Sequence, residues 1–218
     1  MLRLWIDTQF NSSDDVGTLR YAIAHPGVEI VGISTVGSEV ATAATAVREF
    51  FENANRAAPL IYAGPPDPRA LDMAEAILAI GPLTNLAMLL RAGIALVPTV
   101  VTGVILASDG SRTASDVANS NFGIDPLSAA VVVAEATDLL LTPTHICETI
   151  AARMQGPLAL LALLGELVQI EKRSLAVTVE GLLVIDDRDG VEHDLVVWAD
   201  AAAAQRRMDH LNADFGVA

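Results

Sequence analysis

Short apolar runs alternate along most of the chain with stretches of helical periodicity. The apolar runs suit strands that are buried on both faces, and they lie at 2–6, 28–35, 60–63, 76–80, 100–107 and 139–141. The helical stretches lie at 16–24, 41–56, 83–91 and 126–136. This alternation predicts βαβ units, and therefore an open, mostly parallel α/β sheet with helices on both faces.

The last third of the chain has a different pattern. One long apolar helix is predicted from about Pro157 to Ile170, and two strands are predicted over 176–185 and 195–199. A polar turn at 186–190 separates these strands, and a final helix is predicted over 201–215. We therefore expect a C-terminal antiparallel hairpin and helix at the sheet edge, within a single domain that spans residues 1–218.

The apolar content is high for a protein with few aromatic residues. Hydrophobic residues make up 52% of the chain and aromatic residues 4%, which fits buried parallel strands and a subunit interface. The longest apolar stretch, 158–170, contains Gly165, Glu166 and Gln169 and is shorter than the ~20 residues that cross a bilayer. We expect it to be a core or interface helix, and we expect a homo-oligomer with no membrane partner.

Charge and cysteine content exclude several classes of function. Twenty-seven acidic residues stand against 13 basic ones, for a net charge of −14, and no basic run could follow a phosphate backbone. Nucleic acid is therefore not an expected partner. The single cysteine, Cys147, excludes an internal disulfide and a cysteine-based zinc cluster. The N-terminus has no basic segment followed by a long apolar one, so we expect a cytoplasmic protein.

The most informative polar segment, which we call the acidic turn, comprises residues 7–15 between the first strand and the first helix. It contains three carboxylates, and open α/β sheets bind ligands at such strand ends. Ser12 or Ser13 could cap the helix alone, which leaves Asp14 and Asp15 in excess of structural need. Neighbouring acids repel one another unless a cation or a hydroxyl-rich ligand lies between them.

Several segments, in order, carry recognisable motifs over most of the chain. The most specific reads LAIGPLTNLA, and the set lies at 7–16, 31–40, 62–64, 78–87, 117–126, 181–186 and 195–200. They resemble the nucleoside hydrolases, whose members cleave the N-glycosidic bond of ribonucleosides with a calcium-bound water. The family's opening DTDPGxDDA corresponds to the acidic turn, which is one residue longer. Its VAEFN corresponds to Val117–Asn121, and its TRGxTVVD hairpin to the last two segments.

The resemblance implies roles for individual residues. Asp15 and the residue at position 9 would ligate Ca²⁺ through their side chains, and Ile80 through its carbonyl oxygen. Asp14 and Asn121 would bind the ribose hydroxyls. A hard cation suits such oxygen ligands, and metal binding lowers the pKa of the bound water.

Three positions depart from the family pattern. Gln9 replaces the acid that binds calcium and takes the proton from water, and an amide cannot act as a base near neutral pH. Glu39 replaces a ribose-binding Asn, and Asn119 replaces a Glu. These two exchanges are what a carboxylate moved across the pocket would produce, and Asp7 and Asp14, with Gln9, are our candidates for the catalytic positions.

The family's late His-Asp pair has two possible counterparts. His193-Asp194 has the right residue types, but its surroundings match the terminal hairpin better. Either this dipeptide is the pair, or the segment that carries the pair is deleted and the dipeptide is a surface feature at a strand start.

Three functions follow as hypotheses. The leading one is a hydrolase that cleaves a ribonucleoside or related ribosyl compound with a cation-bound water. The alternative is a catalytically degenerate relative that serves as a ligand-binding or assembly module, or has altered chemistry. A phosphatase with Asp7 as nucleophile is a third, and Gln9 stands against it because such sites use an acid two positions later.

Overall fold

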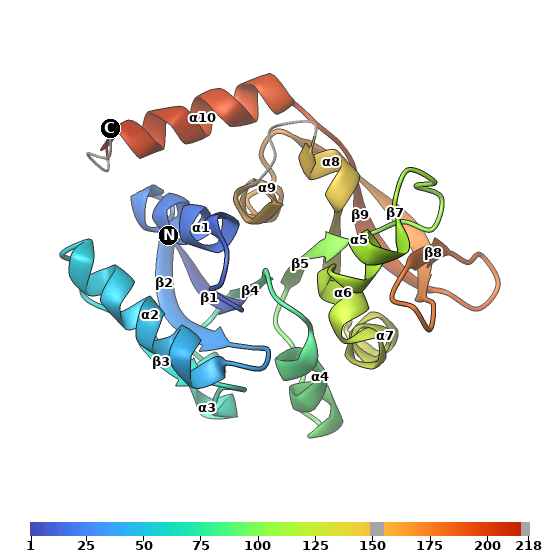
Figure 1. The fold of residues 1–218 in the computed structure, drawn as a ribbon, viewed down its shortest axis with the longest axis horizontal. Coiled ribbons are helices and arrows are strands. Elements are labelled where there is room, and N and C mark those ends of the chain that lie inside the picture. Colours follow the sequence, from blue (N-terminus) through green and yellow to red (C-terminus); the bar gives the residue numbers. More distant parts are fainter. Residues whose placement is uncertain (149–154, 215–218) are drawn as a thin grey trace.

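The computed structural model describes residues 1–148 and 155–214, and its centre is one twisted sheet (Figure 1). The described strands are β1 (Leu2–Thr8), β2 (Val28–Thr35), β3 (Leu60–Ala63), β4 (Ala76–Ala79), β5 (Thr99–Val104), β6 (Leu139–Pro143), β7 (Val168–Val177), β8 (Leu183–Ile185) and β9 (Val191–Ala199). Their order across the sheet is β3-β2-β1-β4-β5-β6-β9-β7-β8. Strands β1 to β6 and β9 run parallel, and β7 is antiparallel to both β8 and β9. The expected α/β class is confirmed.

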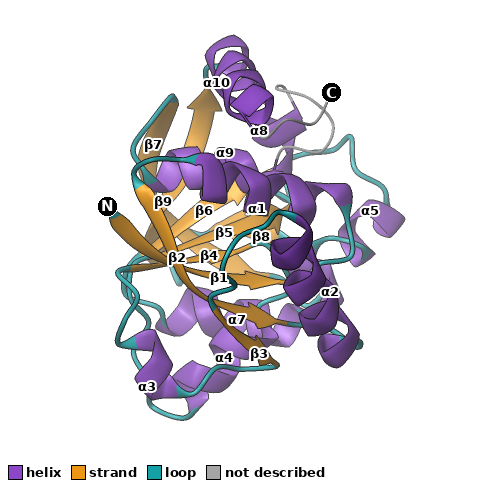
Figure 2. Ribbon diagram, turned by 90° about the vertical axis from the view of Figure 1, so that its left-hand side faces the viewer, coloured by secondary structure: helices purple, strands orange, loops and turns teal. Residues whose placement is uncertain are grey.

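Helices cover both faces of the sheet (Figure 2). The described helices are α1 (Ser13–Ala24), α2 (Val40–Asn53), α3 (Pro68–Leu71), α4 (Thr84–Arg91), α5 (Ala114–Ala118), α6 (Asn121–Ile124), α7 (Pro126–Glu135), α8 (Thr144–Glu148), α9 (Gln155–Leu163) and α10 (Ala201–Asp214). Alternate residues of β1 enter two separate cores: Leu4 and Ile6 pack with α1, α2 and α9, and Trp5 packs with α3, α4 and α7. Burial on both faces explains the apolar strand sequences.

The strand order reverses beside β1. The chain moves from β1 outward through β2 and β3, and then returns to place β4 on the other side of β1. In open α/β sheets, a crevice forms at such a reversal, outside the carboxyl ends of the strands. The acidic turn follows β1 and therefore lies at this point.

The prediction of one long apolar helix over 157–170 is wrong in its second half, where the chain turns and enters a strand. Helix α9 ends at Leu163, and Gly165 and Leu167 then take positive φ values of 70° and 61°, which turn the chain into β7. The alternation of apolar and polar residues from Val168 onward is that of a strand. Helix α9 is also not an exposed contact surface, because Leu158 to Leu161 are all 0% exposed. Its all-round apolarity reflects a place in the core, and the oligomeric state stays a prediction.

The C-terminal strands also differ from the predicted pair. The predicted strand over 176–185 contains the end of β7, a turn and β8, while β9 begins at Val191 and lies between β6 and β7. Antiparallel strands are therefore present at the sheet edge as expected, but β7 pairs with both β8 and β9 rather than forming one simple hairpin. None of the described helices is long and apolar enough to cross a membrane.

Candidate active site

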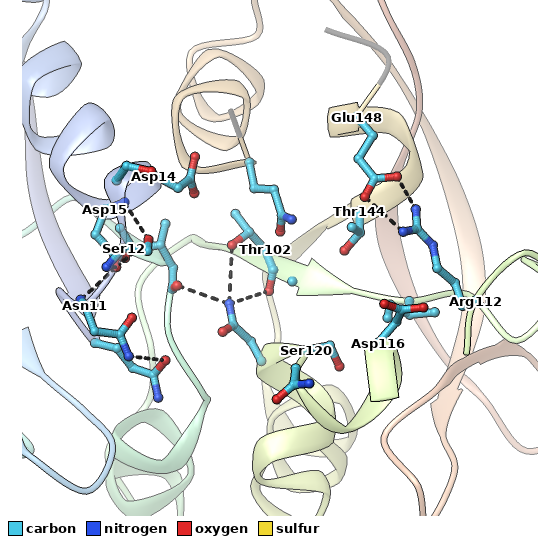
Figure 3. A pocket seen from close by; sticks show the side chains of 18 residues that line it. Asn11, Ser12, Asp14, Asp15, Thr102, Arg112, Asp116, Ser120, Thr144 and Glu148 are labelled. Atoms are coloured by element: carbon cyan, nitrogen blue, oxygen red, sulfur yellow. Dashed lines mark hydrogen bonds and ion pairs between the residues drawn. The ribbon is translucent and has the colours of Figure 1, made fainter. Parts of the chain in front are cut away.

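A polar cavity of about 520 Å³ opens at the carboxyl ends of four parallel strands (Figure 3). The first residues after β1, β4, β5 and β6 all line it, namely Gln9, Ile80, Ile105 and Thr144. Its other described lining residues are Asn11, Ser12, Ser13, Asp14, Asp15, Thr102, Gly103, Arg112, Asp116, Asn119, Ser120, Asn121, Glu148 and Gln155. The strand reversal thus brings together most of the site residues that the sequence indicates.

Asp15 holds the acidic turn together. Ser12 is the N-cap of α1 and accepts from the backbone N–H of Asp15, while the Asp15 carboxylate accepts from the N–H of Ser12 at 3.0 Å and from its hydroxyl at 2.8 Å. This is a reciprocal capping box. The same carboxylate accepts from the hydroxyl of Thr8 at 2.9 Å and from the N–H of Asn11 at 3.1 Å. Asp15 is 4% exposed, so these donors replace water around its charge.

Asp14 is the least satisfied carboxylate of the turn. Its Oδ2 accepts from the backbone N–H of Gly156, at the start of α9, at 3.1 Å. Its Oδ1 is buried and has no hydrogen-bond partner among the described residues. Burial raises the pKa of Asp14 to about 6, the bond from Gly156 opposes this, and the neighbouring Asp15 charge adds to it. A carboxylate with this pKa is a base matched to neutral solution.

Asn121 is fixed at the floor of the cavity. Its side-chain amide donates to the carbonyl of Ile80 at 3.1 Å and to the carbonyl of Thr102 at 3.2 Å. Gly103 has a φ of 70°, and a Cβ there would lie 2.5 Å from the Asn121 amide nitrogen, so only glycine allows this approach. Because the amide nitrogen faces the two carbonyls, the Asn121 oxygen is left to accept from a ligand hydroxyl.

Asp7 lies behind the cavity and does not line it. It is fully buried, and its Oδ1 accepts from the Ser34 hydroxyl and from the Asn85 amide at 2.8 Å. Asn85 belongs to the GPLTN motif and also donates to the carbonyl of Thr35, so this motif ties α4 to β1 and β2. Burial raises the pKa of Asp7 to about 7, against the two hydrogen bonds. Asp7 therefore cannot act as a phosphatase nucleophile on a ligand in the cavity.

Gln9 lines the cavity where the strand ends. The side-chain amide nitrogen of Asn11 donates to the side-chain oxygen of Gln9 at 3.5 Å. Gly81 of the GPLTN motif packs below, where a Cβ would lie 3.0 Å from the Gln9 backbone nitrogen. The close approach of the two loops explains why this position is glycine.

The far wall of the cavity holds an ion-pair cluster that sequence reasoning missed. Arg112 donates to Asp109 at 2.9 Å and makes a two-pronged ion pair with Glu148 on α8. Hydrogen bonds from Ser111 and Arg112 lower the pKa of Asp109 to about 2. The pair joins residues 36 positions apart, and no local pattern marks it.

Beside this cluster lies a second capping box. Thr113 caps α5 and accepts from the N–H of Asp116, whose carboxylate accepts from the N–H and hydroxyl of Thr113. These bonds hold the pKa of Asp116 below its usual value. The Thr-x-x-Asp spacing in the sequence is typical of such a helix start and could have predicted α5.

Two further predictions concern the rim of the cavity. Asn119 lines it, and its amide donates to the carbonyl of Ser115 at 2.8 Å. Glu39 is exposed and does not line it. It lies at the N-terminus of α2, and the Thr42 hydroxyl donates to its carboxylate at 3.5 Å.

His193-Asp194 is not part of the site. Both residues lie within β9, and His193 is buried with its Nε2 2.6 Å from the carbonyl oxygen of Val133. Neither residue lines the cavity, and of the predicted surface feature only Asp194 has an exposed side chain. Lys172 of β7 lies 3.8 Å from Asp194.

The residues implied as calcium ligands do not fit the ion as they stand. Asp15 already accepts four hydrogen bonds, three of them on one oxygen. The Ile80 carbonyl accepts from Asn121, and position 9 has an amide in place of an acid. No three histidine, cysteine or acidic side chains are grouped to hold a metal among the residues that the structure describes. Calcium would have to share the Asp15 and Ile80 oxygens with the hydrogen bonds that shape the acidic turn, and position 9 would offer it a neutral oxygen.

Nearly the whole chain superposes on solved nucleoside hydrolases. An inosine-uridine preferring enzyme from Bacillus anthracis matches with a TM-score of 0.76 and 17% identity, over 98% of this chain and 100% of that one. A purine-preferring ribonucleoside hydrolase from Gardnerella vaginalis matches with 0.77 and 16%, over 98% and 99%. A plant nucleoside hydrolase matches with 0.78 and 12%, over 97% and 99%.

Sequence comparison adds no closer relative, since no protein-family model and no curated protein sequence matches. At identities this low, the structural likeness shows the fold. The chain has the nucleoside hydrolase fold, as its sequence motifs imply.

Proposed function

We propose that the cavity binds the ribosyl part of a nucleoside, or of a related ribosyl compound, and that the protein hydrolyses the N-glycosidic bond. The observation that carries the proposal is the placement of Asp14, a partly buried carboxylate whose Oδ1 is buried and has no hydrogen-bond partner among the described residues, in a cavity at the strand reversal of a nucleoside hydrolase fold. A volume of about 520 Å³ is in the range of pockets that enclose small ligands.

In this proposal Asp14 and Asn121 carry the main roles. The oxygen of Asn121 accepts from a ribose hydroxyl, because its amide nitrogen is held by Ile80 and Thr102. Water attacks C1′ of the ribose and gives a proton to Asp14. The electron pair of the C1′–N bond goes to the leaving nitrogen. Carboxylates around C1′ stabilise the positive charge that develops on the sugar in an oxocarbenium-like transition state.

The proposal contains no calcium step. The ligand oxygens that the resemblance assigns to calcium are used within the protein, and Gln9 cannot serve as the base. Asp14 therefore takes the proton from a water that the protein alone positions.

A panel of purine and pyrimidine nucleosides tests this function, with released reducing sugar as the readout. Each reaction is run in chelator and again with added calcium, and the Asp14→Asn variant is the control for contaminating enzymes. We expect sugar release by the wild-type chain that Asp14→Asn lacks. Absence of release from every compound at high protein concentration would exclude the hydrolase.

A second candidate function is ligand binding without cleavage. The hydrogen bonds that occupy Asp15 and Ile80, together with Gln9, favour it, because they remove the metal-bound nucleophile of the resembled family. Binding of nucleosides in calorimetry without sugar release would support this function over the first.

A further inference from the structure

Carboxylates outnumber cations in the described lining of the cavity. The described lining has four carboxylates, those of Asp14, Asp15, Asp116 and Glu148, and one guanidinium, that of Arg112. Arg112 is already paired with Glu148, and with Asp109 just outside the cavity. Its one charge is thus shared between these two acids, and the described lining offers no second cation.

The acids lie on two opposite sides of the cavity, as Figure 3 shows. Asp14 and Asp15 come from the start of α1, and Asp116 and Glu148 come from α5 and α8. A ligand between them has negative charge on both sides. A neutral ligand would displace the water that solvates these carboxylates and would bring no positive charge in its place. A cationic ligand would neutralise part of their negative charge.

The lining residues also limit which leaving groups can depart from C1′ of the ribose. The described lining residues include no histidine, lysine, tyrosine or cysteine that could give a proton to a departing base, and His193 is buried elsewhere. They include no aromatic ring on which a base could stack. A neutral nucleobase departs as an anion unless it is protonated. A positively charged ring nitrogen departs as a neutral amine and needs no acid.

We propose that the cavity selects cationic N-ribosides, in which C1′ of the ribose is bonded to a pyridinium-type ring nitrogen. The inference rests on the proposed function and names its substrate class. Water adds to C1′ and passes one proton to the Asp14 carboxylate, while the C1′–N bond breaks. Its electron pair cancels the ring charge, so the products are ribose, a neutral pyridine and a proton that Asp14 returns to solvent.

Nicotinamide riboside and its 1,4-dihydro form are the probes, because they share the ribose and the carboxamide and differ in ring charge. Binding is measured by calorimetry, and cleavage by released sugar, in chelator. We expect the cationic form to bind at least about tenfold more tightly than the neutral form, with the preference reduced by salt. Equal binding of the two forms would overturn the inference.

Variants locate the source of the preference. Glu148→Gln and Asp116→Asn each remove one cavity charge, and each should reduce the cation preference about threefold or more. Asp187→Asn removes one charge from the exposed turn after β8 and should leave the preference unchanged. An equal reduction in all three variants would assign the effect to net charge and overturn the inference.

Failure of the inference is distinguishable from failure of the proposed function. Cleavage of neutral nucleosides without preference for the cation keeps the hydrolase and overturns the substrate class. Selective binding of the cation without cleavage of any N-riboside keeps the charge selection and excludes the hydrolase.

Discussion

Two capping boxes with the same spacing line the cavity from opposite sides. Ser12 and Asp15 form the first, at the start of the twelve-residue α1, and Thr113 and Asp116 form the second, at the start of the five-residue α5. The local bonds are nearly identical. Asp15, however, is 4% exposed and accepts two further hydrogen bonds, whereas Asp116 is exposed.

The difference shows that one local pattern occurs in two environments, one buried and one exposed. In the first box, the capping acid is a structural centre, and we propose that its neighbour Asp14 is the base. In the second box, the equivalent neighbour is Ser115, and the capping acid contributes charge to the cavity wall. Adjacent acids in a helix-starting turn can therefore have separate roles, which burial decides.

The largest expected effect distinguishes Asp14 from Ser115. Asp14→Asn should lower kcat/KM by about 10² to 10⁴-fold, because an amide cannot accept the proton from water. Ser115→Ala should change it less than about twofold, since Ser115 does not line the cavity. In the wild-type chain, activity should fall as the pH drops below about 6, where Asp14 becomes protonated. Equal activity of Asp14→Asn and wild type would exclude Asp14 as the base.

The next effect compares the two capping acids by stability. Asp15→Ala should lower the free energy of unfolding by about 2–4 kcal/mol, since it removes the cap and leaves buried donors without an acceptor. Asp116→Ala should have a clearly smaller effect, because water can replace its bonds. Urea denaturation followed by circular dichroism measures both, and equal losses would contradict the assigned roles.

A smaller effect concerns Asp7, which lies beneath the first box. Its pKa is about 7 in the folded chain and near 4 when unfolded, so the folded state holds the extra proton between these values. The stability from Asp7 is therefore complete below about pH 4 and is lost as the pH rises through about 7. The loss is at most about 1.4 kcal/mol per pH unit for one proton. Asp7→Asn should flatten this part of the pH–stability curve in urea denaturation, and an unchanged slope would contradict the burial effect.

The smallest expected effect is that of Gln9→Asp. An acid at this position alone should not create stoichiometric calcium binding, because the Asp15 carboxylate and the Ile80 carbonyl remain hydrogen-bonded within the protein. Calorimetry with calcium measures this. Tight binding by the variant would show that the acidic turn rearranges easily around a cation.

The fold could be predicted where one signal dominates. Strands such as 28–35 and 60–63 have the predicted bounds, because turn-forming Pro and Gly residues lie beside each run, at Pro26-Gly27, Pro59 and Gly64. The end of α9 was predicted too late, because apolar residues continue past Gly165 and Glu166 into the strand and were assigned to the helix. The alternation after Val168 was the signal, and the positive φ of Leu167 has no sequence counterpart.

The site was predictable to the extent that motifs placed it. Gln9, Asp14, Asp15, Ile80, Asn119 and Asn121 all line the cavity. The Arg112–Glu148 pair was not predictable, because the two residues meet only when the loop after β5 folds against α8. The four hydrogen bonds that Asp15 accepts could not be predicted either, because a motif gives the type of a residue and not the number of donors around it.

The central claim is that this cavity cleaves N-ribosides with Asp14 as the base and without calcium. Initial rates of sugar release from the best substrate of the panel, measured in excess chelator and in added calcium, test it most directly. The account predicts the same rate in both conditions and no rate for Asp14→Asn. A rate that vanishes in chelator and returns with calcium would contradict it.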